Sequence, residues 1–438
     1  MPIDVKDVNR LAFPAIVAAV SEPIINICDS AIIGRYGSDP VTMLAAVGIG
    51  SSFFLSFIWV FSQTRTAMSS VLSKYYGANN LDEVKTLVPQ MILMNFILGL
   101  FIYLVTNLFI HPIFELFDAK GEVLTMTIEY FSIRAIGFPF ALSTLMIFGV
   151  FRGIQNTMWA MIITLIAGSI NLLLDLLFIN GWGDYISPLG LKGVALASLI
   201  AQLFMFGIAI IFLYKKTRFS LNFMKPINLE VNNLLGMSGN LIIRSLAVNT
   251  AYFFSNMFAS HYGESQIAVQ GIFMNIWLFS AFFIEGYCNA GNALAGKLYG
   301  MNDRNGLWEL SVFINKNALR LAFGLMLVLF AGYYFIGRLF LDDENTLTIF
   351  YSTFWLVLIT LPLNAVAFTY DEIFKGIGKA AFLRNVLLFA TFLVFVPLIW
   401  TFDLFGLEMF SVWMAFNGWM GFRAIRLSSY FKQHYRIK

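Results

Sequence analysis

Carboxylate side chains occur inside long apolar stretches of this 438-residue sequence. Asp29 ends the run Ile-Ile-Asn-Ile-Cys-Asp, and Asp175 ends the run Asn-Leu-Leu-Leu-Asp. An ionised side chain at the centre of a hydrocarbon-embedded helix costs at least about 2.5–3.5 kcal/mol. We therefore expect each of these acids to have a functional or structural role. Asn171 lies one helical turn before Asp175 and would share its face, where its amide could donate to a carboxylate. We expect Asp29, Asn171 and Asp175 to form one polar pocket.

The chemistry expected of such a pocket is the uptake of a small cation. Two carboxylates in a low-dielectric pocket cannot both ionise cheaply, so one of them would carry a proton. Fully ionised, the same oxygens would suit a hard cation such as Na⁺. Glu22 lies seven residues before Asp29 on the same predicted helix face, and it is either a member of the network or a contact of a neighbouring Ser or Thr. Pro14 is a candidate hinge in that helix, because proline removes a backbone hydrogen bond and bends a helix.

A second set of buried acids is expected in the C-terminal half. Glu285 lies within Phe-Ile-Glu-Gly-Tyr, and Asp371 lies within Thr-Tyr-Asp-Glu-Ile. These two acids could neutralise a cationic substrate or form a second ion site. The alternative is that they pair with Arg244 or with a lysine at a helix end such as Lys375.

The composition requires that the elements holding these residues lie in a membrane. Hydrophobic residues make up 59% of the chain and charged residues 12%, and there are 47 phenylalanines. Soluble proteins average about 45–50% apolar and about 25% charged residues, so a soluble fold has too little interior for this chain. A net charge of +3 gives no reason to expect nucleic-acid binding. Two cysteines and three scattered histidines indicate neither a disulfide framework nor a metal site, and no cofactor is expected.

Twelve transmembrane helices are predicted from apolar stretches bounded by charged and turn residues. If both termini are cytoplasmic, 21 of the 28 Lys and Arg residues fall in inner segments and helix ends, against four in outer segments. This asymmetry follows the positive-inside rule and predicts a multi-pass protein of the inner (plasma) membrane with both ends in the cytoplasm. The predicted spans are 8–34, 48–73, 87–110, 124–151, 157–180, 191–214, 234–260, 267–296, 309–337, 347–374, 380–402 and 406–427.

The sequence also contains an internal repeat. Residues 73–80 recur as 296–303, and Phe-Arg-Gly-Ile at 151–154 recurs as Phe-Lys-Gly-Ile, both at an offset of 223. Parallel six-helix repeats are a transporter architecture with a central cavity and alternating access. The repeat predicts an all-α integral membrane protein of two pseudo-symmetric six-helix lobes around such a cavity. The predicted division is an N-lobe at 1–215, a cytoplasmic linker at 216–233 and a C-lobe at 234–438.

Several motifs together resemble one family. Glu-Pro-Ile-Ile-Asn-Ile-Cys-Asp-Ser-Ala-Ile-Ile-Gly-Arg-Tyr-Gly, at 22–37, resembles the first-helix signature of multidrug and toxic compound extrusion (MATE) transporters, especially their DinF-like branch. The segments at 151–157, 171–175, 190–198, 284–296 and 370–376 resemble further segments of the same branch, in the same order.

The resemblance implies the fold of the MATE transporters and their superfamily, and an exporter that exchanges organic compounds for H⁺ or Na⁺. By the same resemblance Asp29, Asn171 and Asp175 match the family's cation site, Ser198 stands where a further ligand contributes, and Pro14 matches the bending proline. The partners expected are small organic substrates, the coupling cation and the lipid bilayer, and the protein is expected to be a monomer.

Two other functions compete with the antiporter. A flippase for lipid-linked precursors shares the broader superfold, but a cationic cavity would suit its pyrophosphate cargo, whereas Glu285 favours positive or zwitterionic cargo. A membrane enzyme that uses paired acids lacks an accompanying histidine cluster, nucleophile motif or metal-ligand spacing.

Overall fold

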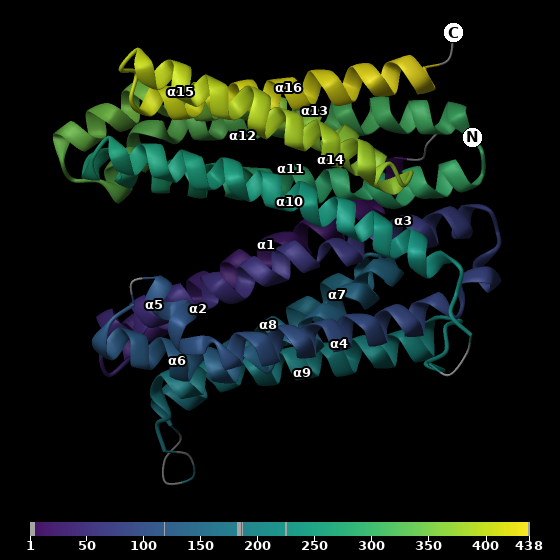
Figure 1. Ribbon diagram of the computed structural model, residues 1–438, viewed down its shortest axis with the longest axis horizontal. Helices are drawn as coiled ribbons and strands as arrows, with labels where there is room; N and C mark the ends of the chain where they lie inside the picture. The colour runs from purple at the N-terminus through teal and green to yellow at the C-terminus, as the bar shows by residue number, and fades with distance from the viewer. Residues whose placement is uncertain (1–4, 118, 182–184, 186, 224–225, 437–438) are drawn as a thin grey trace. The chain divides into compact units, whose positions relative to one another are not determined.

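The computed structural model describes residues 5–117, 119–181, 185, 187–223 and 226–436, and within these ranges all regular structure is helical (Figure 1). The side chains of Val5, Glu22 and Pro23 are outside the description. The N-terminal half contains α1 Val5–Tyr36, α2 Pro40–Phe61, α3 Gln63–Gly77, the 3₁₀ helix η1 Leu81–Val84, α4 Leu87–Leu108, α5 Ile110–Leu116, α6 Gly121–Ala135, α7 Phe138–Gly153, α8 Met158–Asn180 and α9 Gly190–Lys216. The C-terminal half contains α10 Glu230–His261, α11 Glu264–Gly300, α12 Arg304–Phe340, α13 Glu344–Gly376, α14 Ala380–Phe389, the π-helix η2 Ala390–Phe395, α15 Val396–Leu404 and α16 Met409–Tyr435.

Each of the twelve predicted spans coincides with one helix or with helices that follow one another directly. In the described part of the chain, nine helices are long and apolar enough to cross a membrane, and the α6–α7 pair, bent by 48°, makes a tenth. The other two predicted spans are α10 and α16, which are long enough to cross but carry more polar residues. The apolar faces of these helices dissolve in lipid, so the fold is that of a multi-pass membrane protein.

The chain divides into two compact units. One unit comprises Val17–Tyr75 and Asn79–Leu235, and in it α8 packs on α9, α4 on α7, and α6 on both α2 and α9 (Figure 1). Its core is aromatic: Phe54, Phe131 and Phe138 are at most 1% exposed, and the Phe138 ring contacts the other two. We refer to this unit as the N-unit. The packing of the N-unit fixes the position of α6 beside α2 and α9.

The other unit, which we refer to as the C-unit, comprises Met1–Ile16, Tyr76–Ala78 and Gly236–Lys438. In it α13 packs on α11, α12 and α16. Trp277, Trp413 and Trp419 are at most 2% exposed, and each contacts Phe416, also buried, edge-on or at a tilt. α13 is therefore the central helix of the C-unit, and the acids it carries are buried.

Helix packing repeats at the same offset as the sequence. A Cβ added to Gly153 on α7 would lie 2.5 Å from the Leu72 Cβ and 3.2 Å from the Ser69 carbonyl oxygen on α3. A Cβ added to Gly376 on α13 would lie 2.2 Å from the Asn292 carbonyl oxygen on α11. Gly153 and Gly376 are 223 residues apart, and so are Ser69 and Asn292. Glycine allows two membrane helices to approach closely, so each half of the chain uses the same device at the equivalent crossing.

Helix α1 belongs to both units. It runs without a break from Val5 to Tyr36, and Pro14 lies inside it. The boundary between the units falls between Ile16 and Val17, two residues after Pro14. The one proline of α1 whose side chain is described therefore stands next to the point where the chain changes unit.

The segment between α9 and α10 is attached to the start of α4. Asn228 donates two hydrogen bonds to this region: its backbone N–H donates to the Gln90 Oε1 at 2.9 Å, and its Nδ2 donates to the Glu83 carbonyl oxygen at 2.8 Å. Gln90 in turn donates to the Pro226 carbonyl oxygen at 2.9 Å. These bonds lie within the N-unit, so the end of the predicted linker 216–233 is anchored there.

Aspartate caps begin several of the long helices. Asp303 accepts from the Gly306 backbone N–H at 2.8 Å, and Asp343 accepts from the Thr346 backbone N–H at the same distance. The Thr346 hydroxyl also donates to Asp343, and these bonds hold the pKa of Asp343 below its usual range. Such caps satisfy backbone donors that a helix leaves unpaired at its first turn.

The glycine crossing on α13 yields a stability prediction. Gly376→Ala should destabilise the protein by about 1–3 kcal/mol, because the new methyl group would collide with the backbone of α11 rather than with a movable side chain. Gly324→Ala on α12 is the matched control, since nothing lies within 4 Å of a Cβ built there. Thermal unfolding of both variants in detergent measures the difference. Equal melting temperatures for the two variants would contradict the close approach of α13 and α11.

Candidate functional site

Helix α8 carries two of the predicted site residues on one buried face. Asn171 and Asp175 are separated by one turn, and Asp175 is 0% exposed. The Asn171 Nδ2 donates to the Asp175 Oδ2 at 3.1 Å. The same nitrogen lies 3.5 Å from the Ser198 Oγ on α9, which packs beside α8. Asn171 therefore links the carboxyl group of α8 to the hydroxyl group of α9.

Helix α1 brings Asp29 to this pair. Asp29 is half-buried, and its carboxyl group lies close enough to that of Asp175 for the two to share a hydrogen bond when one of them carries a proton. In both residues the Oδ1 atom is buried and has no hydrogen-bond partner among the residues that the structure describes. The site formed by Asp29, Asn171, Asp175 and Ser198, which we call the carboxyl pair site, lies entirely within the N-unit.

A positive charge stands close to the carboxyl pair site. Arg134 on α6 is the cation whose field acts on both Asp29 and Asp175. Its guanidinium carbon lies 4.4 Å from the ring centroid of Phe54 on α2, a cation–π contact. The Nε and Nη1 atoms of Arg134 are buried and have no hydrogen-bond partner within the described ranges. The sequence showed Arg134 as a charge inside a span but did not place it beside the aspartates.

Two further residues of the sequence prediction, Glu22 and the hinge candidate Pro14, stay predictions. The side chain of Glu22 lies outside the described residues, so its predicted place in the network stays a prediction. Pro14 is buried on α1 in the segment that belongs to the C-unit.

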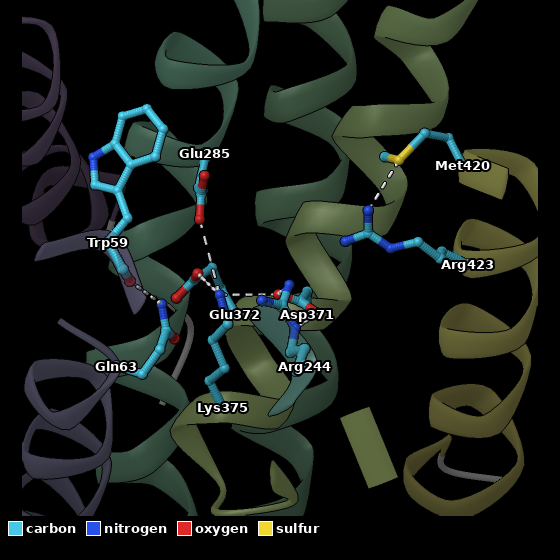
Figure 2. Close-up of polar contacts among 9 residues, drawn as sticks. All are labelled: Trp59, Gln63, Arg244, Glu285, Asp371, Glu372, Lys375, Met420 and Arg423. Carbon is cyan, nitrogen blue, oxygen red and sulfur yellow. Dashed lines mark hydrogen bonds and ion pairs between the residues drawn. The ribbon is translucent and has the colours of Figure 1, made fainter. Parts of the chain in front are cut away.

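The acids of the C-unit form a cluster of ion pairs with basic residues (Figure 2). Arg244 on α10 donates two hydrogen bonds to Asp371 on α13, from Nε to Oδ1 at 3.2 Å and from Nη2 to Oδ2 at 2.5 Å. Lys375, one turn further along α13, lies 2.9 Å from the Asp371 Oδ2 and 2.6 Å from the Glu372 Oε1. Arg244, Asp371, Glu372 and Lys375 are all at most 9% exposed. Asp371 is thus paired on both oxygens, as the alternative in the sequence analysis proposed.

Glu285 stands apart from the other acids of this cluster. It comes from α11, and its Oε1 lies 3.8 Å from the Lys375 Nζ, at the long end of an ion pair. Its side chain is 41% exposed, against 2% for Asp371 and 3% for Glu372. Figure 2 shows it above the end of the Lys375 side chain, whereas Arg244 lies to the right, beside Asp371. Glu285 therefore keeps a carboxylate that another cation can reach.

One buried arginine lies near the end of a predicted span, where the sequence alone indicates a helix end rather than a buried position. Arg423 on α16 is 2% exposed, and its guanidinium carbon lies 4.7 Å from the ring centroid of Trp419. Its Nη1 donates to the Met420 Sδ at 3.0 Å. The signal in the sequence was its place four residues before the end of the predicted span 406–427, one turn deeper than a helix end requires.

Neither unit shows a metal centre in the part of the chain that is described. Groups of three or more His, Cys, Asp or Glu side chains that could hold a metal ion are absent from those residues. The carboxyl pair site offers carboxyl, amide and hydroxyl oxygens, which suit a proton or a hard monovalent cation.

The ion-pair cluster yields a stability prediction. Asp371→Asn should destabilise the protein by about 3–5 kcal/mol, because it leaves Arg244 and Lys375 without their shared counter-charge in a buried place. Glu344→Gln is the control, since Glu344 pairs with Arg338 at the surface, where such a pair contributes about 1 kcal/mol or less. Detergent-solubilised melting temperatures compare the two. If Asp371→Asn melted no lower than Glu344→Gln, the cluster would not stabilise α13.

The sequence is similar to one transporter family over most of its length. The MatE family model matches residues 14–177 and 241–401. Curated relatives include DETOXIFICATION 42 of Arabidopsis thaliana, 24% identical, over 95% of this chain and 90% of the relative. The DNA damage-inducible protein F of Escherichia coli is 24% identical over 98% of this chain and 92% of its own. The multidrug export protein MepA of Staphylococcus aureus is 22% identical over 83% and 80%.

Solved structures share the fold. A MOP superfamily transporter from Pyrococcus furiosus superposes with a TM-score of 0.88 at 21% identity, covering 98% of this chain and 95% of that one. The crystal structure of MATE in the bent conformation gives the same TM-score and identity, covering 98% and 96%. Because the family model spans both halves of the sequence, this chain belongs to the MatE family of multidrug and toxic compound extrusion transporters.

Proposed function

We propose that this chain is a secondary antiporter that exports amphipathic organic compounds, cationic or zwitterionic, in exchange for H⁺. Na⁺ is the alternative coupling ion. The observation that carries the proposal is the contact between the carboxyl groups of Asp29 and Asp175 inside an apolar bundle. An exporter function is in keeping with relatives such as MepA, which is named a multidrug export protein.

The carboxyl pair is suited to bind a single proton. An ionised carboxylate only accepts hydrogen bonds, so two carboxyl groups in contact need a proton on one of them. Loss of that proton leaves two like charges in a low-dielectric region, which is costly. Asn171 supports either state, because its amide donates to Asp175 while Ser198 lies on its other side. Proton occupancy therefore changes the free energy of the conformation that holds Asp29 against α8.

Helix α1 is the element that would convert this change into movement. It carries Asp29, and Pro14 lies two residues from the point where the chain passes from one unit to the other. A proline leaves a gap in the helical hydrogen-bond ladder and makes bending easier at that place. We infer that Pro14 is the hinge and that transport proceeds by alternating access.

The cargo would be recognised by charge in the C-unit. Asp371 is occupied by Arg244 and Lys375, so it supports the fold and the position of Lys375. Glu285, loosely held and 41% exposed, is the acid available to a cationic group. A negatively charged pyrophosphate would be repelled by it, so the observation does not favour a lipid-linked precursor flippase.

The membrane location and the partners of this exporter are proposed from the sequence. The positive-inside asymmetry supports the inner membrane with both termini in the cytoplasm. Small organic molecules, the coupling cation and the bilayer are the proposed partners, with the protein acting as a monomer and without a cofactor.

Removal of one acid of the pair tests the coupling. Asp29→Asn should abolish substrate efflux driven by a pH gradient in proteoliposomes, because an amide cannot take up and release the proton. The fold should survive, since the variant resembles the protonated acid in shape. Glu129→Gln is the control: it removes an acid of α6 that is paired with Lys192 and 45% exposed. Wild-type efflux by Asp29→Asn would overturn the proposal. Repeating the assay with Na⁺ gradients at fixed membrane potential distinguishes the two ions.

A second substitution tests charge recognition. Glu285→Gln should weaken the binding of cationic substrates by about tenfold or more while changing the binding of neutral ones little, because a charged hydrogen bond or ion pair is lost. Glu309→Gln, an exposed acid on α12, is the control. Equilibrium binding of a cationic and a neutral compound of similar size gives the comparison. Equal losses for both compounds would exclude a charge-recognition role for Glu285.

A further inference from the structure

The contacts of Arg134 do not explain why a charged side chain lies at this place in a membrane bundle. An arginine inside a membrane bundle normally pairs with an acid or with backbone carbonyls, because an unpaired charge there is expensive. Arg134 forms no ion pair with any described residue, although both aspartates of the carboxyl pair site lie within its electrostatic reach. Its guanidinium lies on the face of Phe54 instead. The cation is thus held near the acids without touching them.

We propose that Arg134 is an internal cation that competes with the external one: its guanidinium moves from Phe54 to Asp29 and Asp175 when the pair loses its proton. This inference rests on the proposed function of the carboxyl pair. It assigns to Arg134 a positioning role that favours H⁺ over Na⁺.

Within the described residues, Arg134 and the two aspartates have unpartnered donors and acceptors that would pair with one another after this movement. Arg134 has two buried donors without partners, Nε and Nη1, and each aspartate has a buried Oδ1 without a partner among the described residues. With the proton bound, the pair and the guanidinium together are neutral. When the proton leaves, the second negative charge strengthens the attraction on the guanidinium, and the geometry of its fork suits carboxylates.

The same movement discriminates between the two ions. A proton needs one carboxylate oxygen, whereas Na⁺ needs several oxygen ligands at once. A guanidinium bound to the deprotonated pair occupies the oxygens that Na⁺ would need. The proton can still enter at a single oxygen and displace it. The pair should therefore respond to pH and be insensitive to Na⁺ while Arg134 is present.

Phe54 provides the position that the Arg134 guanidinium occupies when it is not bound to the two carboxylates. The ring is 1% exposed and stacks on Phe138 with centroids 4.4 Å apart, so it cannot turn away. A cation–π contact with a buried ring is favourable but weaker than pairing with two ionised carboxylates. The guanidinium should thus lie on Phe54 when the pair is protonated and leave it when the pair is ionised.

Other charged groups near α6 are already paired or are exposed. Glu129 on α6 pairs with Lys192 on α9 at 3.4 Å, and Tyr130 shares a hydrogen bond with Ser51 on α2. α2 and α4, which both pack on α6, carry no Asp, Glu, Lys, Arg or His within their described ranges. The remaining titratable groups on α6 and on α5, which also packs on it, are the exposed His111, Glu115 and Glu122.

The test uses three variants of the full-length protein in detergent. Arg134→Gln removes the cation, Phe54→Leu removes its resting place, and Arg35→Gln removes an exposed arginine of the same unit as the control. Infrared titration follows the carboxylic-acid band of the pair, identified by its loss in Asp175→Asn. Binding of radioactive Na⁺ is measured on the same samples.

Opposite shifts are expected for the two variants. Arg134→Gln should move the midpoint of the carboxylic-acid band to higher pH by about one unit or more, since one unit corresponds to a tenfold change in proton affinity. It should also gain Na⁺ binding. Phe54→Leu should move the midpoint to lower pH, because the freed guanidinium spends more time on the carboxylates. Arg35→Gln should match the wild type.

The outcomes separate this inference from the proposed function. An unchanged midpoint and no Na⁺ binding in Arg134→Gln would overturn the role of Arg134, and so would shifts of the same sign in Arg134→Gln and Phe54→Leu. Should Arg134→Gln fail to fold, Arg134→Lys keeps the charge and must retain a midpoint near the wild type and exclude Na⁺. If the wild type shows no carboxylic-acid band that Asp175→Asn removes, it is the proposed proton pair itself that fails.

Discussion

Two carboxyl groups in contact within hydrocarbon are the constraint on which this account depends. Asp29 and Asp175 meet inside the N-unit, where both cannot be ionised at low cost. The neighbouring helices supply the other groups of the site. α8 carries Asn171 one turn away, α9 supplies Ser198, and α1 brings the second acid. A protein that only needed a stable bundle would have no use for such a pair.

The two units treat buried charge in opposite ways. In the C-unit, Arg244 and Lys375 bind Asp371 directly, and the ion pairs are short and buried. In the N-unit, Arg134 is near Asp29 and Asp175 but rests on Phe54. Direct pairing stabilises one arrangement, whereas a cation held at a small distance leaves the acids free to exchange a proton. The halves nevertheless share their helix crossings, since Gly153 and Gly376 stand at equivalent close approaches. The same scaffold thus carries directly paired acids in one half and, in the other, the carboxyl pair to which we assign the proton.

The membrane character, the helix order and the family could be predicted from the sequence. Apolar stretches, charge asymmetry and the 223-residue repeat are local or periodic features, and the structure has helices at each predicted span. A shared pocket for Asp29 and Asp175 was also expected, because both acids lie inside long apolar stretches. Partner choice was harder to predict: the sequence offered Arg244 and Lys375 only as alternative partners of Asp371, and nothing local in it shows that Arg134 lies on Phe54. Such contacts depend on which faces of distant helices meet. Arg423 was misjudged for the same reason, because a residue one turn from a helix end is buried or exposed according to its neighbours.

The most direct test of the central claim is a count of protons released when substrate binds to the purified protein in weakly buffered detergent. If Asp29 and Asp175 share one proton that the cargo displaces, the wild type should release about one proton per protein molecule near neutral pH. The protein with Asp175→Asn should release none. Substrate binding without proton release by the wild type, or equal release by both proteins, would contradict the account.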